Sequence, residues 1–104
     1  MTYRVIFSPE AEEQLITLYN YIASASTPDI AAQYTEAIVS YCESLYSFPI
    51  RGTVRDDVRH GLRITNYKKR TVIAFEVGTK TRQVSIIGLF HGGQDYGTIL
   101  QNND

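Results

Sequence analysis

The chain begins with an alternation of apolar and other residues over "TYRVIFS". One side of this segment carries Tyr3, Val5 and Phe7. A period of two residues is typical of a strand that buries one face. We therefore predict an N-terminal strand.

Two segments with apolar residues at helical spacing come next. A Ser-Pro pair precedes the first and a Thr-Pro pair precedes the second, each combining a capping hydroxyl with a proline suited to the first helical position. The pattern predicts helices over about 9–23 and about 28–47. Because the linker between them is short, we expect an antiparallel helical hairpin whose shared apolar side covers a sheet.

The second half of the chain has the pattern of three strands. The preceding segment "PIRGTVRDDV" reads as a loop from its Pro, Gly and Asp content. The predicted strands are "GLRITNY", "TVIAFEVG" and "QVSIIGLF", with a two-residue turn at Lys68-Lys69 and a longer one at "TKTR". We predict an α+β fold in which a strand and a two-helix hairpin precede a three-stranded antiparallel sheet, in the order β-α-α-β-β-β. One domain is expected over 1–104.

The last predicted strand is apolar on both faces. Strict alternation separates its residues into Val84, Ile86, Gly88 and Phe90 on one face, and Ser85, Ile87, Leu89 and His91 on the other. Such a strand normally lies in the middle of a sheet with cover on each side. The hairpin can cover one face, and either the C-terminal "YGTILQNND" or a partner's helix must cover the other. Ile87 and Leu89 are therefore candidate partner-binding residues.

Charge is balanced overall and uneven along the chain. The formal net charge is -1, yet every basic residue except Arg4 lies between Arg51 and Arg82. A local basic surface on a near-neutral protein suits an acidic partner protein at least as well as nucleic acid, which usually calls for a net basic domain.

Several classes of protein are disfavoured by the composition. Cys42 is the only cysteine, so no internal disulfide can form. No segment approaches the roughly 18 apolar residues of a membrane span, and the N-terminal apolar patch is too short for a secretory signal. We expect a cytoplasmic protein with no membrane partner. We expect neither a cofactor nor a metal, because Asp56, Asp57 and Glu76 lack the spacing of a metal site.

Four stretches, together with the order of elements, resemble the toxins of the RelE/ParE superfamily of type II toxin-antitoxin systems, most closely the ParE branch. They are "SPEAEEQLITLYNYIA", "AAQYTEAIVSYCESLYSFPIRGTVRDDVRHGLR", "YKKRTVIAFEV" and "IIGLFHGGQDY". The resemblance implies a small toxin that forms a hetero-oligomer with a cognate antitoxin encoded beside it. It also implies one of two targets. ParE-like toxins are associated with inhibition of DNA gyrase, whereas RelE-like toxins cleave mRNA on the ribosome.

Candidate catalytic residues cluster in "GLFHGGQDY". Metal-independent RNA cleavage needs a base, an acid and cations around the phosphorane. His91 could be the base or acid and Tyr96 a second proton donor. The candidates for the cationic clamp are Arg63, Lys68, Arg70 and Arg82. A Gly-Gly pair separates His91 from Tyr96, whereas catalytic groups need rigid support, and the chain lacks the net positive charge that favours RNA binding.

The remaining candidates for partner binding are Arg51, Arg55, Arg63, His91, Asp95 and Tyr96. The arginines either pair with nearby carboxylates on a solvated surface or recognise an antitoxin or target. We expect Arg63 to form a structural ion pair or to anchor an antitoxin carboxylate. ParE-like sequences often carry arginines directly after the His-Gly pair, where this chain has Gly93 and Gln94.

Three functions remain open from the sequence. The first is a ParE-like toxin that inhibits DNA gyrase by binding. The second is a ribosome-dependent mRNA endoribonuclease of the RelE type. The third is a module that binds an antitoxin without being toxic, which the absence of arginines at Gly93 and Gln94 suggests.

Overall fold

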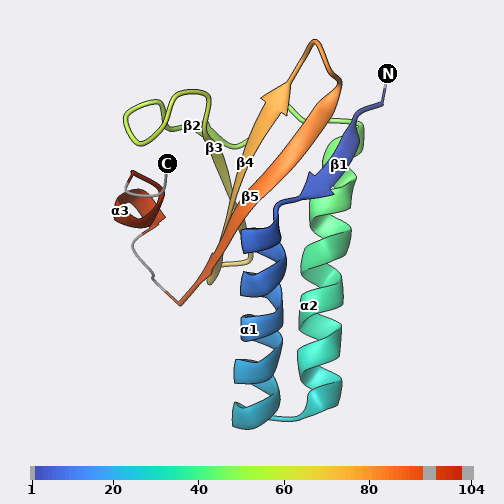
Figure 1. Cartoon of the computed structure of the whole chain (residues 1–104). Coiled ribbons are helices and arrows are strands. Elements are labelled where there is room, and N and C mark those ends of the chain that lie inside the picture. Colours follow the sequence, from blue (N-terminus) through green and yellow to red (C-terminus); the bar gives the residue numbers. More distant parts are fainter. Residues whose placement is uncertain (1, 93–95, 102–104) are drawn as a thin grey trace.

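The structure, a computed structural model, describes residues 2–92 and 96–101, and shows a five-stranded sheet with two long helices on one face (Figure 1). The elements in chain order are β1 (Arg4–Phe7), α1 (Pro9–Ala25), α2 (Pro28–Glu43), the 3-10 helix η1 (Ser44–Tyr46), β2 (Thr53–Val54), β3 (Arg63–Tyr67), β4 (Thr71–Gly78), β5 (Gln83–His91) and α3 (Tyr96–Gln101). The strand order is β1-β5-β4-β3-β2. β1 runs parallel to β5, and the other neighbours are antiparallel. The α+β class and the order of the predicted elements are confirmed.

Both long helices begin at the predicted caps. The Ser8 hydroxyl oxygen accepts a hydrogen bond from the Ala11 amide at 3.0 Å, and the Thr27 hydroxyl oxygen accepts one from the Ile30 amide at 3.1 Å. Each cap satisfies an amide that has no partner within its helix and stabilises the helix by about 1 kcal/mol. α1 continues slightly beyond the prediction, to Ala25.

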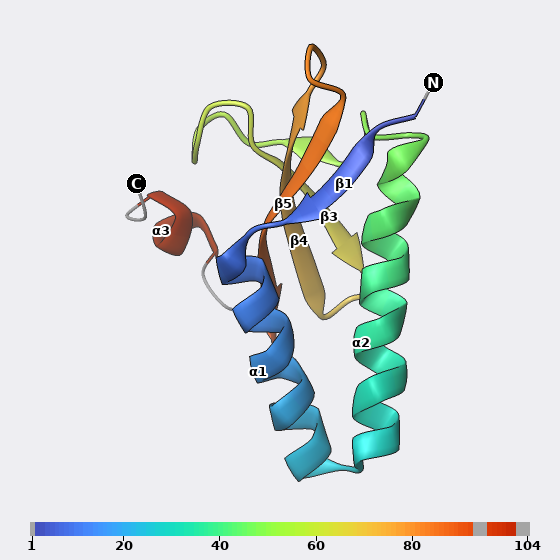
Figure 2. The ribbon, with the colours of Figure 1, turned by 45° about the vertical axis from the view of Figure 1, so that its right-hand side comes forward.

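The main core lies between the helical hairpin and the sheet (Figure 2). Ile38, Cys42 and Leu45 pack there against residues of β4 and β5, including Phe75 and Ile86. Burial raises the pKa of the Cys42 thiol to about 12, and the nearby Glu43 carboxylate adds to this effect. The thiol is therefore uncharged at neutral pH and acts as a small apolar side chain.

A β-bulge in β5 changes which residues face the helices. The register passes over Ile87, which has no partner in β4. Before the bulge, Val84 and Ile86 pack beneath the helices; after it, Leu89 does so, whereas Phe90 joins a cluster on the opposite face. One extra residue reverses the alternation of a strand. The face assignment from strict alternation is therefore right as far as Ile87 and wrong from Gly88 onward.

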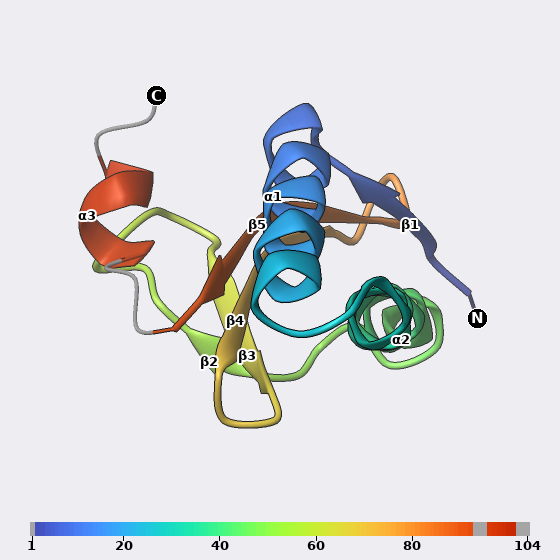
Figure 3. The same ribbon diagram turned by 90° about the horizontal axis from the view of Figure 1, so that it is seen from below.

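The opposite face of the sheet is covered in part by the chain's own C-terminal helix, as Figure 3 shows. Leu100 of α3 packs with Leu62, Ala74 and Phe90, and each of these four side chains is buried. Of the two alternatives for this face, the C-terminal segment supplies cover within the chain itself.

Three local features differ from the sequence prediction. The short strand β2 lies inside the predicted loop, where Thr53 and Val54 pair with β3 while both remain exposed. α3 forms in the predicted tail, and the turn between β3 and β4 comprises the three residues 68–70. All three are too short to carry a hydrophobic period, so tertiary pairing and packing decide them.

The close approach of β5 to the ring of Phe90 generates a prediction for Gly88. A Cβ added at Gly88 would lie 2.6 Å from an atom of this buried ring. Gly88→Ala should lower the free energy of unfolding by about 1–3 kcal/mol, because the core has no room for the extra methyl group. Urea denaturation followed by circular dichroism measures the change.

Gly78 is the matched control for this substitution. A Cβ at Gly78 would meet the hydroxyl oxygen of Thr81 at 2.5 Å, but this side chain is exposed and can rotate away. Gly78→Ala should therefore lower the free energy of unfolding by less than Gly88→Ala does. Equal midpoints for the two variants would show that Phe90 does not limit the space at Gly88.

Candidate functional site

The predicted catalytic candidates lie at separate places in the fold. His91 ends β5 on the helix side of the sheet, where its ring contacts that of Tyr34 from α2. Tyr96 begins α3 on the other side and packs against Phe90. Arg82 precedes β5, so the length of that strand, at about 3.3 Å per residue, separates Arg82 from His91 by roughly 30 Å. His91, Tyr96 and Arg82 therefore do not form one site.

His91 is held by a chain of hydrogen bonds to β4 and α2. Its Nδ1 lies 3.0 Å from the hydroxyl oxygen of Thr71, and the same oxygen lies 3.0 Å from the hydroxyl oxygen of Tyr34. The Thr71 side chain is buried. The rings of Tyr34 and His91 meet edge to face with centroids 5.9 Å apart. These contacts orient the imidazole from two elements.

The environment of His91 keeps its imidazole neutral. Burial lowers the pKa of His91 from its ordinary value of 6.5, and the positive charge of Arg70 lowers it further. Both effects disfavour the protonated form. At neutral pH the ring can therefore accept a proton or a hydrogen bond, but it adds no positive charge.

A groove of about 540 Å³ lies beside His91, between α1 and the end of β5. Leu18 and Leu89 line it together with polar side chains that include Gln14, and Arg70 and His91 lie on the same lining. Gln14 also fastens the strand, since its side-chain oxygen accepts a hydrogen bond from the Leu89 amide at 2.6 Å. Leu89, predicted to bind a partner, is only 4% exposed and packs in the main core.

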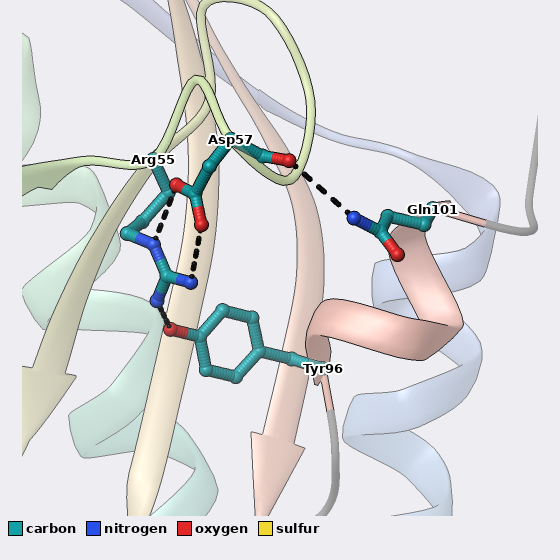
Figure 4. A network of polar contacts seen from close by, with 4 residues as sticks. All are labelled: Arg55, Asp57, Tyr96 and Gln101. Carbon is teal, nitrogen blue, oxygen red and sulfur yellow. Dashed lines mark hydrogen bonds and ion pairs between the residues drawn. The ribbon is translucent and has the colours of Figure 1, made fainter.

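A second polar cluster joins α3 to the loop between β2 and β3 (Figure 4). Arg55 donates two hydrogen bonds to the carboxylate of Asp57, each 2.9 Å long, and a third to the hydroxyl of Tyr96. Gln101 donates from its side-chain amide to the backbone carbonyl of Asp57 at 3.4 Å. The hydrogen bond from Arg55 lowers the pKa of the Asp57 carboxyl and raises that of Arg55. The Tyr96 hydroxyl thus has a structural contact.

The two remaining predicted arginines meet aromatic and backbone groups. The guanidinium of Arg51 lies over the ring of Tyr41, 5.2 Å from its centroid. Arg63 donates to the backbone carbonyl of Arg51 at 3.3 Å, and within the described part of the chain it forms no ion pair. The structural ion pair expected of Arg63 is therefore absent there, because no described carboxylate comes within reach.

The last two predicted partner-binding residues have different outcomes. Ile87 is partly buried and packs against the cluster under α3, so its side chain is largely covered by the chain itself. Asp95 lies outside the described residues, as do Gly93 and Gln94.

Gln14 is the main site residue that the sequence reasoning missed. It lies within the apolar stripe of α1, at helical spacing from Ala11 and Leu18. A polar residue in such a stripe signals a buried hydrogen-bonding partner, because burying an unpaired amide is unfavourable. The pattern therefore contained a clue to this contact.

Within residues 2–92 and 96–101, no three side chains of His, Cys, Asp or Glu lie close enough together to hold a metal ion. The helices of the same residues are too short or too polar to cross a membrane.

The neutral state of His91 predicts a pH dependence of stability. The unfolded chain takes up a proton on this residue near pH 6.5, whereas the folded chain resists it until lower pH. Stability should therefore fall as the pH drops below 6.5, because the unfolded state binds more protons there. The loss should be smaller in His91→Gln, measured by urea denaturation at a series of pH values.

His60 supplies the control, since its side chain is fully exposed. His60→Gln should keep the pH dependence of the unmodified protein. Identical profiles for His91→Gln and the unmodified protein would contradict a partly buried, neutral imidazole.

The Arg55 cluster predicts a local effect on α3. Arg55→Ala removes the contacts to Asp57 and Tyr96, so the Leu100 amide should exchange with solvent about three to ten times faster, the factor typical of one lost net hydrogen bond. Arg59→Ala is the control, because Arg59 forms only an exposed ion pair with Glu76 at 3.6 Å. Unchanged exchange in Arg55→Ala would show that apolar packing alone holds α3.

Comparisons with known proteins found one family model and two similar solved structures. The family model for the ParE toxin of type II toxin-antitoxin systems, parDE, matches residues 5–96. The chromosomal ParDE TA system from P. aeruginosa has a TM-score of 0.75 at 16% identity, covering 86% of this chain and 96% of that chain. The toxin-antitoxin complex RelBE2 from Mycobacterium tuberculosis has a TM-score of 0.61 at 18% identity, covering 88% and 100%. No curated protein matches the chain in sequence.

The two structural likenesses, at these identities, establish the shared fold alone. The family match extends from β1 to the first residue of α3, so it includes the helical hairpin, β2 to β5 and His91. Because it spans most of the sequence, the chain belongs to the ParE toxin family of type II toxin-antitoxin systems.

Proposed function

We propose that this ParE-family toxin inhibits DNA gyrase by binding to it, and that a cognate antitoxin neutralises it by direct contact. The chain's membership of the ParE family motivates the target. The resemblance of the sequence to ParE-like toxins implies inhibition of gyrase. The solved relatives are toxin-antitoxin systems, which supports an antitoxin partner. We expect the toxin and antitoxin to form a hetero-oligomer in the cytoplasm.

One geometric observation supports binding over cleavage: His91 and Tyr96 lie on opposite sides of the sheet. A general base and a general acid must both come within hydrogen-bond reach of the same substrate. The Tyr96 hydroxyl is also engaged by Arg55. The pair that the sequence offered for acid-base catalysis therefore lacks a shared site.

The charge of the protein supports the same conclusion. A net charge of -1 forgoes much of the counterion release that drives association with RNA. Inhibition by contact with a protein surface does not depend on counterion release from RNA.

The surroundings of His91 favour one alternative, a ribosome-dependent mRNA endoribonuclease. A neutral imidazole oriented by Thr71 could accept the proton of a ribose 2'-hydroxyl, and Arg70 is close enough to lower the pKa of that imidazole. A base beside a cation is what such cleavage needs. Among the described residues that line the groove, no Asp or Glu accompanies His91 as a partner acid.

Expression and supercoiling assays separate these functions. Expression of the toxin without its antitoxin should arrest growth, and co-expression of the protein encoded in the adjacent reading frame should restore it. The purified toxin should inhibit gyrase supercoiling at micromolar concentration. For the double variant His91→Ala with Tyr96→Phe, the concentration that half-inhibits supercoiling should stay within about threefold of the value for the unmodified toxin. The reason is that neither residue takes part in catalysis.

Mapping of mRNA 5' ends after induction provides the contrary test. Unaffected supercoiling together with cuts at fixed codon positions, lost in the double variant, would replace gyrase inhibition by ribosome-dependent cleavage. Normal growth during expression of the toxin alone would instead indicate an antitoxin-binding module that is not toxic. Circular dichroism of the double variant is the control that checks whether it is folded.

A further inference from the structure

We propose that the groove between α1 and the end of β5 is a carboxylate-binding site that receives an acidic, otherwise apolar segment of the antitoxin. This proposal rests on the proposed function, because the antitoxin supplies the segment. It goes further in naming the surface and the side-chain chemistry that this surface selects.

The groove has the size and the apolar floor that a peptide side chain requires. Its volume of about 540 Å³ is within the range of ligand pockets, which is roughly 300–1,000 Å³. Leu18 and Leu89 are nearly buried, at 7% and 4% exposure, and lie at its bottom. Tyr21 also lines the groove and remains 64% exposed, so its ring can pack against an incoming apolar side chain.

The polar groups around this floor favour an acceptor in the ligand. The side-chain oxygen of Gln14 is already used by the Leu89 amide, which leaves the NH₂ group of Gln14 as a donor. Thr17 and Tyr21 contribute hydroxyl groups that can donate. The described lining includes no Asp or Glu, so nothing in it repels an anion.

Arg70 supplies the positive charge. It lies on the turn between β3 and β4 next to Lys68 and Lys69, and no described carboxylate pairs with it. Lys68 is directed toward the ring of Tyr67, with its nitrogen 5.7 Å from the centroid, so Arg70 is the basic residue of this turn that lines the groove. An arginine without a partner at the end of an apolar groove complements a carboxylate next to an apolar side chain.

An acidic peptide fits these features better than a nucleic acid does. Proteins bind single strands with several cations along a channel and with aromatic faces on which bases stack. Here the floor consists of two leucines, Tyr21 contributes a single exposed tyrosine ring to the described lining, and one arginine supplies the charge. The protein as a whole is not basic, with a net charge of -1.

Small peptides test the chemistry of the groove directly. We would titrate the ¹⁵N-labelled toxin with acetyl-Leu-Glu-Leu-amide and with the isosteric acetyl-Leu-Gln-Leu-amide, and follow the amides of Thr71, Leu89 and Gly92. The Glu peptide should bind at least about fivefold more tightly, the difference expected for one charge-assisted contact. Arg70→Gln should abolish this preference. Lys80→Gln should keep it, because Lys80 is exposed on the turn between β4 and β5.

Three outcomes of the titration would overturn the proposal. The first is an absence of shifts at these amides up to about 10 mM Glu peptide, which is weaker than any useful contact. The second is equal binding of the two peptides. The third is tighter binding of inorganic phosphate or of a short single-stranded RNA than of the Glu peptide, which would assign the groove to phosphate groups.

The antitoxin that restores growth in the expression experiment provides the second test. Arg70→Glu should weaken its binding at least tenfold, or about 1.4 kcal/mol, whereas Lys80→Glu should change it by less than about twofold. If the antitoxin binds the unmodified toxin and both variants equally, the groove proposal fails and the proposed function stands. If it does not bind the unmodified toxin at all, the proposed function itself fails.

Discussion

The inner strand β5 lies between β1 and β4 with apolar residues on both faces, and the other elements of the fold are arranged to cover them. The helical hairpin covers Val84, Ile86 and Leu89 on one side. α3 helps to cover Phe90 on the other. Because apolar burial is the dominant favourable term in folding, a strand of this kind requires two layers of cover in a chain of only 104 residues.

The bulge at Ile87 determines which residues of β5 lie on each face of the sheet. By reversing the alternation it brings Leu89 and His91 to the helix side, where Thr71, Tyr34 and the α1 groove surround the imidazole. Had the alternation continued, His91 would share a side with the Arg55 cluster and Tyr96. The single extra residue therefore separates the two groups that an acid-base mechanism would need to combine.

β1 pairs with β5 only as far as Ile86. Beyond this residue, α1 provides hydrogen-bonding partners for the same edge of β5. The backbone amide of Ser8 donates to the Ile86 carbonyl at 2.9 Å, and the side-chain oxygen of Gln14, further along α1, accepts from the Leu89 amide. The cap residue and a side chain of α1 thus satisfy backbone groups at a strand edge that would otherwise need a further strand. The same arrangement creates the groove, since α1 contacts the strand there through side chains instead of backbone ladders.

The sequence alone determined the periodic elements: the caps at Ser8 and Thr27, the two amphipathic helices, and the strands of the second half each follow from patterns within a few residues. The tertiary structure decided the bulge, β2, α3 and the turn after Tyr67, and with them the positions of candidate site residues such as His91 and Tyr96. These features depend on contacts between residues far apart in the chain, such as Gln14 with Leu89 and Arg55 with Tyr96. A local pattern carries no information on such pairs, because the free energy that selects them arises only when the elements pack together.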